Sequence, residues 1–307
     1  MAQGHTVDYD IITAAETNGA VPVVRKITFA DLKDAIRKGI DDFWAMPTHV
    51  VFLVLIYPIA GLIVGRAMFA YKMIPLLYPV AAGFAFIGPF LAIGLYELSR
   101  RRELGRDTSW RHALDFMYSR SMPSILGLGF LLLAIVILWI SIAGSIFVAN
   151  FGYQEPVSMG AFLADLLTTS PGHRVILVGN AIGLAFAILV LALSVVSFPL
   201  LLDRNVGLAT ALATSVNAVM QNPLVMIVWG LIVIAALVIG AIPFFMGLAI
   251  VVPVLGHATW HLYRKVVEPD QSLRPEFHPK PRRRRYAAEF PASLFVPSSD
   301  SDEDERQ

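Results

Sequence analysis

Long apolar runs alternate with short polar segments along most of this chain. A run of about 20 mostly apolar residues is long enough to cross a bilayer as a helix. The pattern predicts six such spans, over residues 48–65, 74–98, 124–148, 175–202, 224–239 and 244–263. The last two come from one uncharged run, which is too long for a single span and which Gly240 and Pro243 divide with a turn.

A shorter amphipathic segment precedes every second span. Apolar residues recur there at helical spacing, which is typical of helices that lie along a membrane surface. These three segments cover residues 28–44, 109–118 and 206–220. Each leads into a proline at the start of the next span, namely Pro47, Pro123 or Pro223.

The second span of each pair ends on a common pattern. The endings are Leu98-Ser-Arg100, Leu202-Asp-Arg204 and Leu262-Tyr-Arg264. We therefore expect three copies of one unit, an interfacial helix followed by a hairpin of two spans. The units cover about residues 27–102, 107–204 and 205–265.

The longest polar connection, residues 150–173, contains one amphipathic stretch. Residues 157–167 are predicted to form a short helix with an apolar face. We interpret this helix as a surface connector, and a lid over an external cavity is the alternative.

Composition agrees with a membrane location. The 307 residues are 56% hydrophobic and 15% charged, with a mean hydropathy of +0.66. Soluble domains average about 45–50% apolar and about 25% charged residues, so the composition excludes an ordinary soluble enzyme. The chain has no cysteine, which excludes disulfides, iron–sulfur clusters and thiolate metal sites.

The distribution of cationic residues predicts the topology. With six spans and the N-terminus inside, only Arg66, Lys72 and Arg174 of the 24 Lys and Arg residues fall outside. The positive-inside rule therefore places both termini in the cytoplasm of a bacterial cell, with the spans in its inner membrane. The expected fold is an all-α polytopic protein with six transmembrane helices in three hairpins, each preceded by a cytoplasmic interfacial helix. Residues 1–24 are predicted to be flexible, residues 25–267 to form the membrane domain and residues 268–307 to form a disordered tail.

A few ionisable residues lie near the ends of the predicted spans. His257 and His261 are four residues apart and share a helix face, and Glu97 and Asp203 end other spans. Imidazole and carboxylate groups together suit a metal or proton site. The favoured alternative is a belt of polar anchors at the interface, which His49 would join. Its aromatic members would be Trp44, Tyr96, Trp260 and Tyr263.

Two groups of arginines are candidates for contact with lipid headgroups or a partner. They are Arg100, Arg101 and Arg102, and Arg282, Arg283, Arg284 and Arg285. The acidic end of the tail would dock a basic partner or fold back on the second group.

No recognisable catalytic motif is present, since the chain lacks both a phosphate-binding loop and a nucleophile elbow. We therefore predict a non-enzymatic accessory, assembly or interaction subunit. Its partners would be the bilayer and a membrane complex such as a respiratory or photosynthetic assembly, without nucleic acid or a cofactor. One alternative is a transporter or channel for a small solute. Another is a redox-associated component that binds a metal or haem through His257 and His261.

Three strings resemble the signatures of a bacterial family of unknown function, typical of alphaproteobacteria. They are GLYELSRR at residues 94–101, SVVSFPLLLDR at 194–204 and GHATWHLYR at 256–264. The resemblance covers about residues 27–267 and implies a multi-span inner-membrane protein, with no established activity to transfer. Some members carry labels that allude to cytochrome c oxidase subunit I. The sequence does not support that function, because its only histidines near spans, His49, His257 and His261, all lie at span ends.

Overall fold

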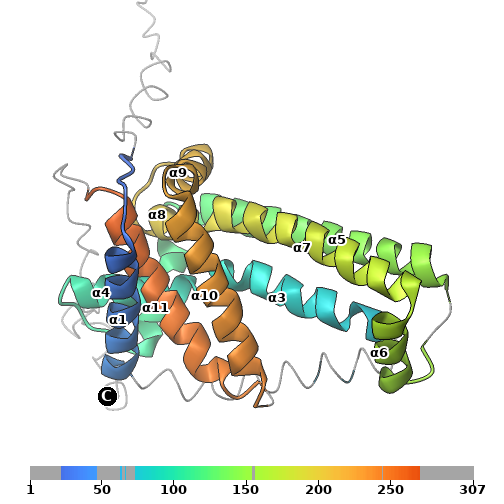
Figure 1. The fold of residues 1–307 in the computed structure, drawn as a ribbon. Coiled ribbons are helices and arrows are strands. Elements are labelled where there is room, and N and C mark those ends of the chain that lie inside the picture. The colour runs from blue at the N-terminus through green and yellow to red at the C-terminus, as the bar shows by residue number, and fades with distance from the viewer. Residues whose placement is uncertain are drawn as a thin grey trace, which may run out of the picture. The chain divides into compact units, whose positions relative to one another are not determined.

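The computed structural model describes residues 22–46, 63, 66, 73–153, 156–243 and 245–269, and helices make up most of this part (Figure 1). The predicted first span, with Pro47 and His49, lies outside the described residues except for Ile63. The tail beyond Pro269, including the arginines at 282–285, also lies outside them. The all-α prediction is confirmed for the described part, in which the single β feature is an isolated bridge between Val24 and Val267.

Four stretches of the described chain are long and apolar enough to cross a membrane. They are Ile74–Glu103, Met122–Phe151, Ser170–Asp203 and Pro223–Ala241. The first contains η3 (Ile74–Leu76), α3 (Leu77–Leu91) and α4 (Ile93–Glu103), and the second is α5 (Met122–Phe151). The third contains α7 (Ser170–Ser194) and α8 (Ser197–Asp203), and the fourth is α10 (Pro223–Ala241). These stretches match the predicted second to fifth spans, so membrane-spanning character is supported for four of the six.

The predicted sixth span is a helix, α11 (Leu248–Val266), but it is not among the four candidate spans. Its first half is apolar, whereas its second half carries His257, His261, Arg264 and Lys265. These polar residues lower the mean hydropathy of α11. They contact residues of other helices. Most of the second half is buried in protein.

Helix α11 packs against α1 (Phe29–Ala45), and this is the most extensive contact between two helices in the described structure. A capping box between Thr28 and Asp31 starts α1. The two helices run antiparallel, since Lys265 pairs with Asp34 at 3.0 Å near one end of the contact. Further along, Gly39 lies against Ala258 with no room for a side chain.

The N-terminal segment before α1 is fixed by the other end of the domain. The backbone N–H of Arg25 donates to the carbonyl of Val266 at 2.7 Å. Asn222, between α9 (Leu208–Gln221) and α10, accepts from the Ile27 N–H at 2.8 Å and donates to the Arg25 carbonyl at 3.0 Å. These contacts join segments about 200 residues apart in the sequence.

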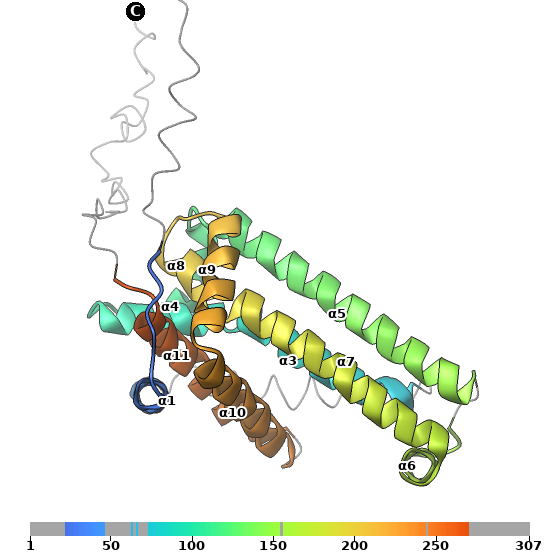
Figure 2. The ribbon, with the colours of Figure 1, turned by 45° about the horizontal axis from the view of Figure 1, so that its top comes forward.

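The predicted short amphipathic segments are helical. The first is α1, and the third is α9. The second forms a 3₁₀ helix, η4 (Trp110–Tyr118), which packs against α4. The helix predicted in the long connection is α6 (Met159–Thr168), which Ser158 caps and which packs on α7. Figure 2 shows α6 near the start of α7, at the end of α7 away from α8.

Two of the long apolar stretches contain a break in the helix. The α3–α4 break lies at Ala92, and the α7–α8 break lies at Val195 and Val196. At the second break the Val196 N–H donates to the buried hydroxyl of Ser215 in α9 at 3.2 Å. The hydroxyl of Ser197 donates to the Ala211 carbonyl at 3.0 Å. Helix α9 thus provides an acceptor for the Val196 N–H, which the break leaves without a helical partner.

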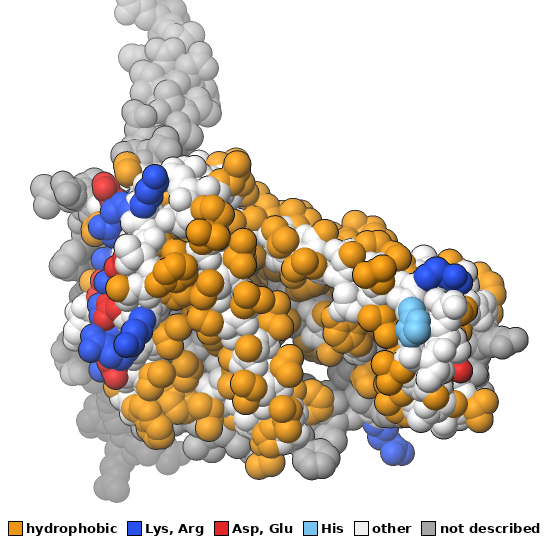
Figure 3. All heavy atoms as spheres, viewed as in Figure 1, with side chains coloured by type: hydrophobic (Ala, Val, Ile, Leu, Met, Phe, Trp, Pro, Cys, Tyr) orange, Lys and Arg blue, Asp and Glu red, His pale blue; other side chains and the backbone are white. Residues whose placement is uncertain are grey.

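Polar and apolar side chains are separated along the helices. Figure 3 shows charged side chains gathered beside α1 and a mainly apolar surface over the neighbouring helices. Exposed large apolar residues occur along α5, α7 and α10, for example Phe130, Leu177 and Leu231. We call the region where α1, α4, α8 and the second half of α11 meet the polar end.

Candidate functional site

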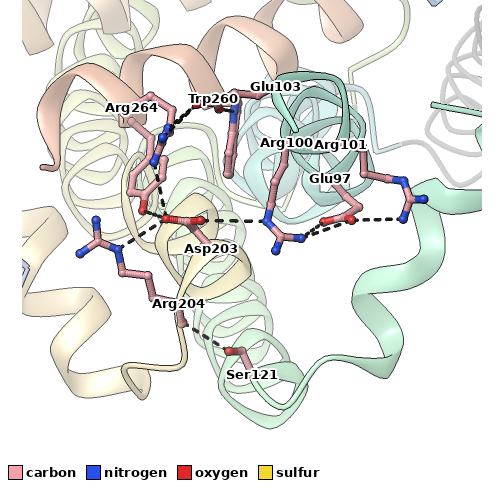
Figure 4. A network of polar contacts seen from close by, with 10 residues as sticks. Glu97, Arg100, Arg101, Glu103, Ser121, Asp203, Arg204, Trp260 and Arg264 are labelled. Atoms are coloured by element: carbon pink, nitrogen blue, oxygen red, sulfur yellow. Dashed lines mark hydrogen bonds and ion pairs between the residues drawn. The ribbon is translucent and has the colours of Figure 1, made fainter. Parts of the chain in front are cut away.

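Asp203, at the end of α8, is the centre of a charged cluster at the polar end (Figure 4). Its carboxylate lies 4.0 Å from Arg100 Nε, 3.5 Å from Arg204 Nε and 3.8 Å from Arg264 Nη1. The Tyr263 hydroxyl donates to Asp203 Oδ2 at 2.7 Å. The three arginines are the residues that end the three similar sequence patterns, so the pattern endings converge on one carboxylate.

Glu97 lies in α4, one turn before Arg100, and pairs with two arginines of the same helix. Its carboxylate lies 3.1 Å from Arg100 Nη1 and 3.9 Å from Arg101 Nη1. Arg101 also reaches Asp115 of η4 at 2.9 Å. Glu97 is buried, and an unpaired buried carboxylate would be costly. Arg100 links this pair to Asp203, so the two carboxylates belong to one network.

Glu103, the last residue of α4, joins α4 to α11. Its carboxylate accepts from Trp260 Nε1 and from Arg264 Nε, both at 3.0 Å. The Trp260 side chain is buried and stacks at a tilt near Tyr263, with ring centroids 5.4 Å apart. Aromatic burial and charge pairing therefore stabilise the same helix contact.

A second polar cluster lies between α1, α4 and α11 around Asp42. The Ser99 hydroxyl donates to Asp42 Oδ2 at 2.5 Å and lies 2.8 Å from His257 Nδ1. His261 Nε2 lies 2.9 Å from the same oxygen, and Arg102 pairs with Oδ1. Asp42, Ser99 and His257 are buried.

The order of the groups in this cluster defines its chemistry. A hydroxyl has one hydrogen, and Ser99 donates it to Asp42, so the Ser99 oxygen accepts a hydrogen bond from the Nδ1–H group of His257. In a Ser-His-Asp triad the histidine stands between the other two groups and takes the serine proton. Here the serine stands in the middle, so its proton is directed to a carboxylate and its oxygen is not activated as a nucleophile by the imidazole.

The environment of Asp42 favours its ionised form. Burial alone would raise the pKa of Asp42, but hydrogen bonds from His261 and Ser99, the charge of His261 and the Arg102 guanidinium outweigh it. The pKa of Asp42 therefore lies below its ordinary value. The cluster is a hydrogen-bonded ion pair that joins three helices.

The predicted metal ligands do not form a common group in the structure. Glu97 and Asp203 face arginines, and His257 and His261 face Ser99 and Asp42. Among the residues that the structure describes, no group of three or more His, Cys, Asp or Glu is arranged to hold a metal.

Most of the predicted interfacial anchors and the arginines predicted to contact lipid are engaged within the protein. Of the predicted aromatic anchors, Trp44 is 73% exposed, whereas Tyr96, Trp260 and Tyr263 are buried in the protein. Arg100, Arg101 and Arg102 make ion pairs within the chain.

Sequence reasoning missed Asp42 and Glu103. The available signal was the position of Asp42, which shares the buried face of α1 with Leu32, Ala35 and Gly39. An acidic residue on an apolar helix face indicates a partner on another element.

Comparison with known proteins bears on the middle of the chain. Residues 77–203, from the start of α3 to the end of α8, match the family described as "Predicted integral membrane protein (DUF2189)". The match includes Glu97, Ser99 and Asp203, whereas Asp42 and all of α11 lie outside it. No curated protein and no solved structure matches the chain. The family match and the four apolar helices together identify the chain as a predicted integral membrane protein whose function is unknown.

Proposed function

We propose that this protein is a non-enzymatic subunit that assists the assembly or the interactions of a larger complex in a bacterial inner membrane. The observation that carries the proposal is the internal pairing of the polar end. The buried or nearly buried carboxylates of Asp42, Glu97 and Asp203 each contact a cationic or hydroxyl group of the same chain. Groups engaged in this way hold helices together, whereas a catalytic centre needs polar groups that can reach a substrate.

The proposed orientation places the polar end in the cytoplasm. Charged residues gather there in the described structure, and the arginines of the charged cluster are among them. Cytoplasmic segments of inner-membrane proteins carry an excess of Lys and Arg. The proposed three-fold repetition of a helix-hairpin unit accounts for the convergence of Arg100, Arg204 and Arg264 on Asp203.

Affinity purification from native membranes tests the subunit proposal. The tagged full-length protein, extracted in a mild detergent, is expected to retain a defined set of membrane proteins at constant ratio. An equally expressed, equally tagged unrelated membrane protein is the control. Recovery of the protein alone, or with the same proteins as the control, would overturn the proposal.

A second candidate function, transport of a small solute, rests on the two helix breaks. Ala92 lies eight residues before Arg100, and Val196 lies eight residues before Arg204, so the breaks occupy corresponding positions. Broken helices at corresponding positions of two repeats are typical of transporter binding sites. The contacts of Ser215 and Ser197 weigh against this function, because they satisfy polar groups at the break that would otherwise face a solute.

Chemical labelling separates the two functions. The cysteine-free chain allows single substitutions Ala92→Cys and Val196→Cys at the breaks, with Leu128→Cys in the core of α5 as the control. A transporter is expected to expose the first two positions to a water-soluble thiol reagent in sealed vesicles while Leu128→Cys stays unreactive. Equal protection at all three positions would eliminate transport through the breaks.

A further inference from the structure

The outer side of η4 carries a strip of cationic and apolar side chains. Arg111, Leu114 and Met117 recur every three residues, so they lie in one row along a 3₁₀ helix. Arg106 precedes the helix and Arg120 follows it. Leu114 is 54% exposed and Met117 is 52% exposed. We call these five residues the η4 strip.

The inner side of η4 is fixed to the rest of the protein. Phe116 packs against the core. Asp115 accepts from Arg101 at 2.9 Å, and the Asp107 carbonyl accepts from Arg101 Nε at 2.7 Å. His112 contacts both acidic side chains, at 2.8 Å from Asp115 and 3.1 Å from Asp107. The carboxylates of Asp107 and Asp115 are therefore paired with His112 and Arg101, although the Asp107 side chain is 68% exposed.

The exposed cations around η4 outnumber its one largely exposed carboxylate, Asp107. Arg106, Arg111 and Arg120 are exposed, and none of them forms an ion pair or side-chain hydrogen bond within the part of the chain that the structure describes. Arg100, Arg101 and Arg102, the arginines predicted to meet lipid, are instead occupied inside the protein. Close to the start of α5, the cations available for an external anion are thus those of the η4 strip.

The position of the η4 strip in the chain places it at the level of the phospholipid headgroups. Ser119, Arg120 and Ser121 alone separate η4 from α5, the 30-residue apolar helix that is a candidate span. A segment this close to the start of a span lies at the boundary between hydrocarbon and water. Phospholipid phosphates lie at the same level, and Leu and Met side chains next to arginines suit the boundary between headgroups and acyl chains.

We infer that the η4 strip binds the headgroups of anionic phospholipids, with Arg106, Arg111 and Arg120 on the phosphates and Leu114 and Met117 between acyl chains. The strip gives the protein a preference for anionic over zwitterionic lipid. This inference does not depend on which partner or solute the protein serves.

Lipid selectivity of the reconstituted full-length protein tests the inference. Vesicles of phosphatidylcholine receive spin-labelled phosphatidylglycerol or spin-labelled phosphatidylcholine, and the relative association of the two probes is measured. Wild-type protein is expected to prefer phosphatidylglycerol. In the variant Arg106→Gln/Arg111→Gln/Arg120→Gln, the ratio of phosphatidylglycerol to phosphatidylcholine association is expected to fall about fivefold for each arginine removed.

Two further variants keep the result interpretable. The triple Arg→Lys variant at the same positions retains the charge, so it is expected to retain most of the preference, which separates charge loss from misfolding. The matched control Lys26→Gln/Lys33→Gln/Arg37→Gln removes three exposed cations from the N-terminal segment and α1 and is expected to leave the preference intact.

Two results would overturn the inference. One is an unchanged lipid preference in the Arg→Gln variant. This result overturns the inference even if the variant loses an acidic protein partner, because the strip would then bind protein and not lipid. The other is an equal loss in the α1 control, because the preference would then arise from diffuse charge rather than from the η4 strip.

Discussion

Gly39 of α1 lies so close to Ala258 of α11 that a Cβ on Gly39 would stand 2.6 Å from the Ala258 backbone nitrogen. Small residues let two helix backbones approach closely. This contact lies between the Lys265–Asp34 ion pair and the Asp42 cluster. The spacing of the two helices therefore determines whether both polar contacts form.

Gly39→Ala is expected to destabilise the protein, because the new methyl group meets backbone atoms that must shift. The expected loss is about 1–3 kcal/mol of unfolding free energy, measured by chemical unfolding in detergent. Gly179→Ala is the matched control, since Gly179 also lies within a helix but has open space around it. Equal effects of the two substitutions would show that close packing of α1 on α11 is not the cause.

Asp203→Asn is expected to weaken the junction of α4, α8 and α11, because Arg100, Arg204 and Arg264 lose a shared counter-ion. Removing one partner of a largely buried ion pair costs about 3–5 kcal/mol, and we expect the lower part of that range since Arg100 and Arg264 are 26% and 27% exposed. Thermal unfolding of the detergent-solubilised protein measures the loss.

Tyr263→Phe separates the hydrogen bond from the ion pairs at the same site. It removes one hydroxyl donor to Asp203, so a smaller loss of about 1.5–3 kcal/mol is expected. Asp41→Asn, on the exposed face of α1, is the charge control and is expected to stay within about 0.5 kcal/mol of the wild type. A loss in Asp41→Asn as large as in Asp203→Asn would contradict the role of the cluster.

The Asp42 cluster predicts a loss of stability in acid. The pKa of Asp42 is lowered in the folded protein from about 3.9 in an unfolded chain. Ionised Asp42 therefore stabilises the fold above about pH 3.9, and this contribution is lost as the pH falls through the folded-state pKa. Unfolding free energy measured from pH 7 downward is expected to fall less steeply for Asp42→Asn than for the wild type, because the variant cannot titrate at this position.

The Lys265–Asp34 ion pair predicts a loss of stability in strong base. Hydrogen bonding to Asp34 raises the pKa of Lys265 above 10.5. The contribution of charged Lys265 is thus fully present below pH 10.5 and is lost as the pH rises through the folded-state pKa. Lys265→Gln is expected to reduce the free energy of unfolding at pH 7. In strong base the variant is expected to lose less stability than the wild type, because it has no lysine to deprotonate at this position. An unaltered pH profile in both Asp42→Asn and Lys265→Gln would contradict the proposed α1–α11 contacts.

Two exposed tyrosines allow the proposed orientation to be tested in the cysteine-free chain. Tyr118 lies at the end of η4 and Tyr153 follows α5, and both are 91% exposed. A membrane-impermeant maleimide applied to the periplasmic face of intact cells is expected to label Tyr153→Cys and not Tyr118→Cys. Permeabilised cells, in which both should react, are the control. The reverse pattern in intact cells would place the polar end outside the cytoplasm.

Much of the helical structure follows from local sequence. The span predicted over residues 124–148 is the helix Met122–Phe151, and the span predicted over 224–239 is Pro223–Ala241. Apolar length and the prolines at helix starts carry this information. The break at Val195 and Val196 also has a local cause, because Pro199 has no N–H to donate to the Val195 carbonyl and its ring disturbs the preceding turn. The contact of the Val196 N–H with Ser215 of α9 could not be predicted from local sequence.

The polar clusters could be predicted only in part. The shared pattern endings indicated that Arg100, Arg204 and Arg264 occupy equivalent positions, but their meeting at Asp203 came only from the structure. The Asp42 cluster joins residues up to 219 positions apart, and no local pattern encodes that pairing. His257 and His261 were selected from their spacing in one helix, but their contacts are with Ser99 of α4 and Asp42 of α1.

The pairing of α1 with α11 has a consequence for synthesis at the ribosome. The helix that covers the buried face of α1 is made some two hundred residues after α1 itself. Throughout that interval the nascent protein carries Leu32, Ala35 and Phe43 without their final neighbours. The α1–α11 contact can therefore form only after α11 has been made, and a chain that stops before α11 leaves the apolar face of α1 uncovered for chaperones and proteases to recognise.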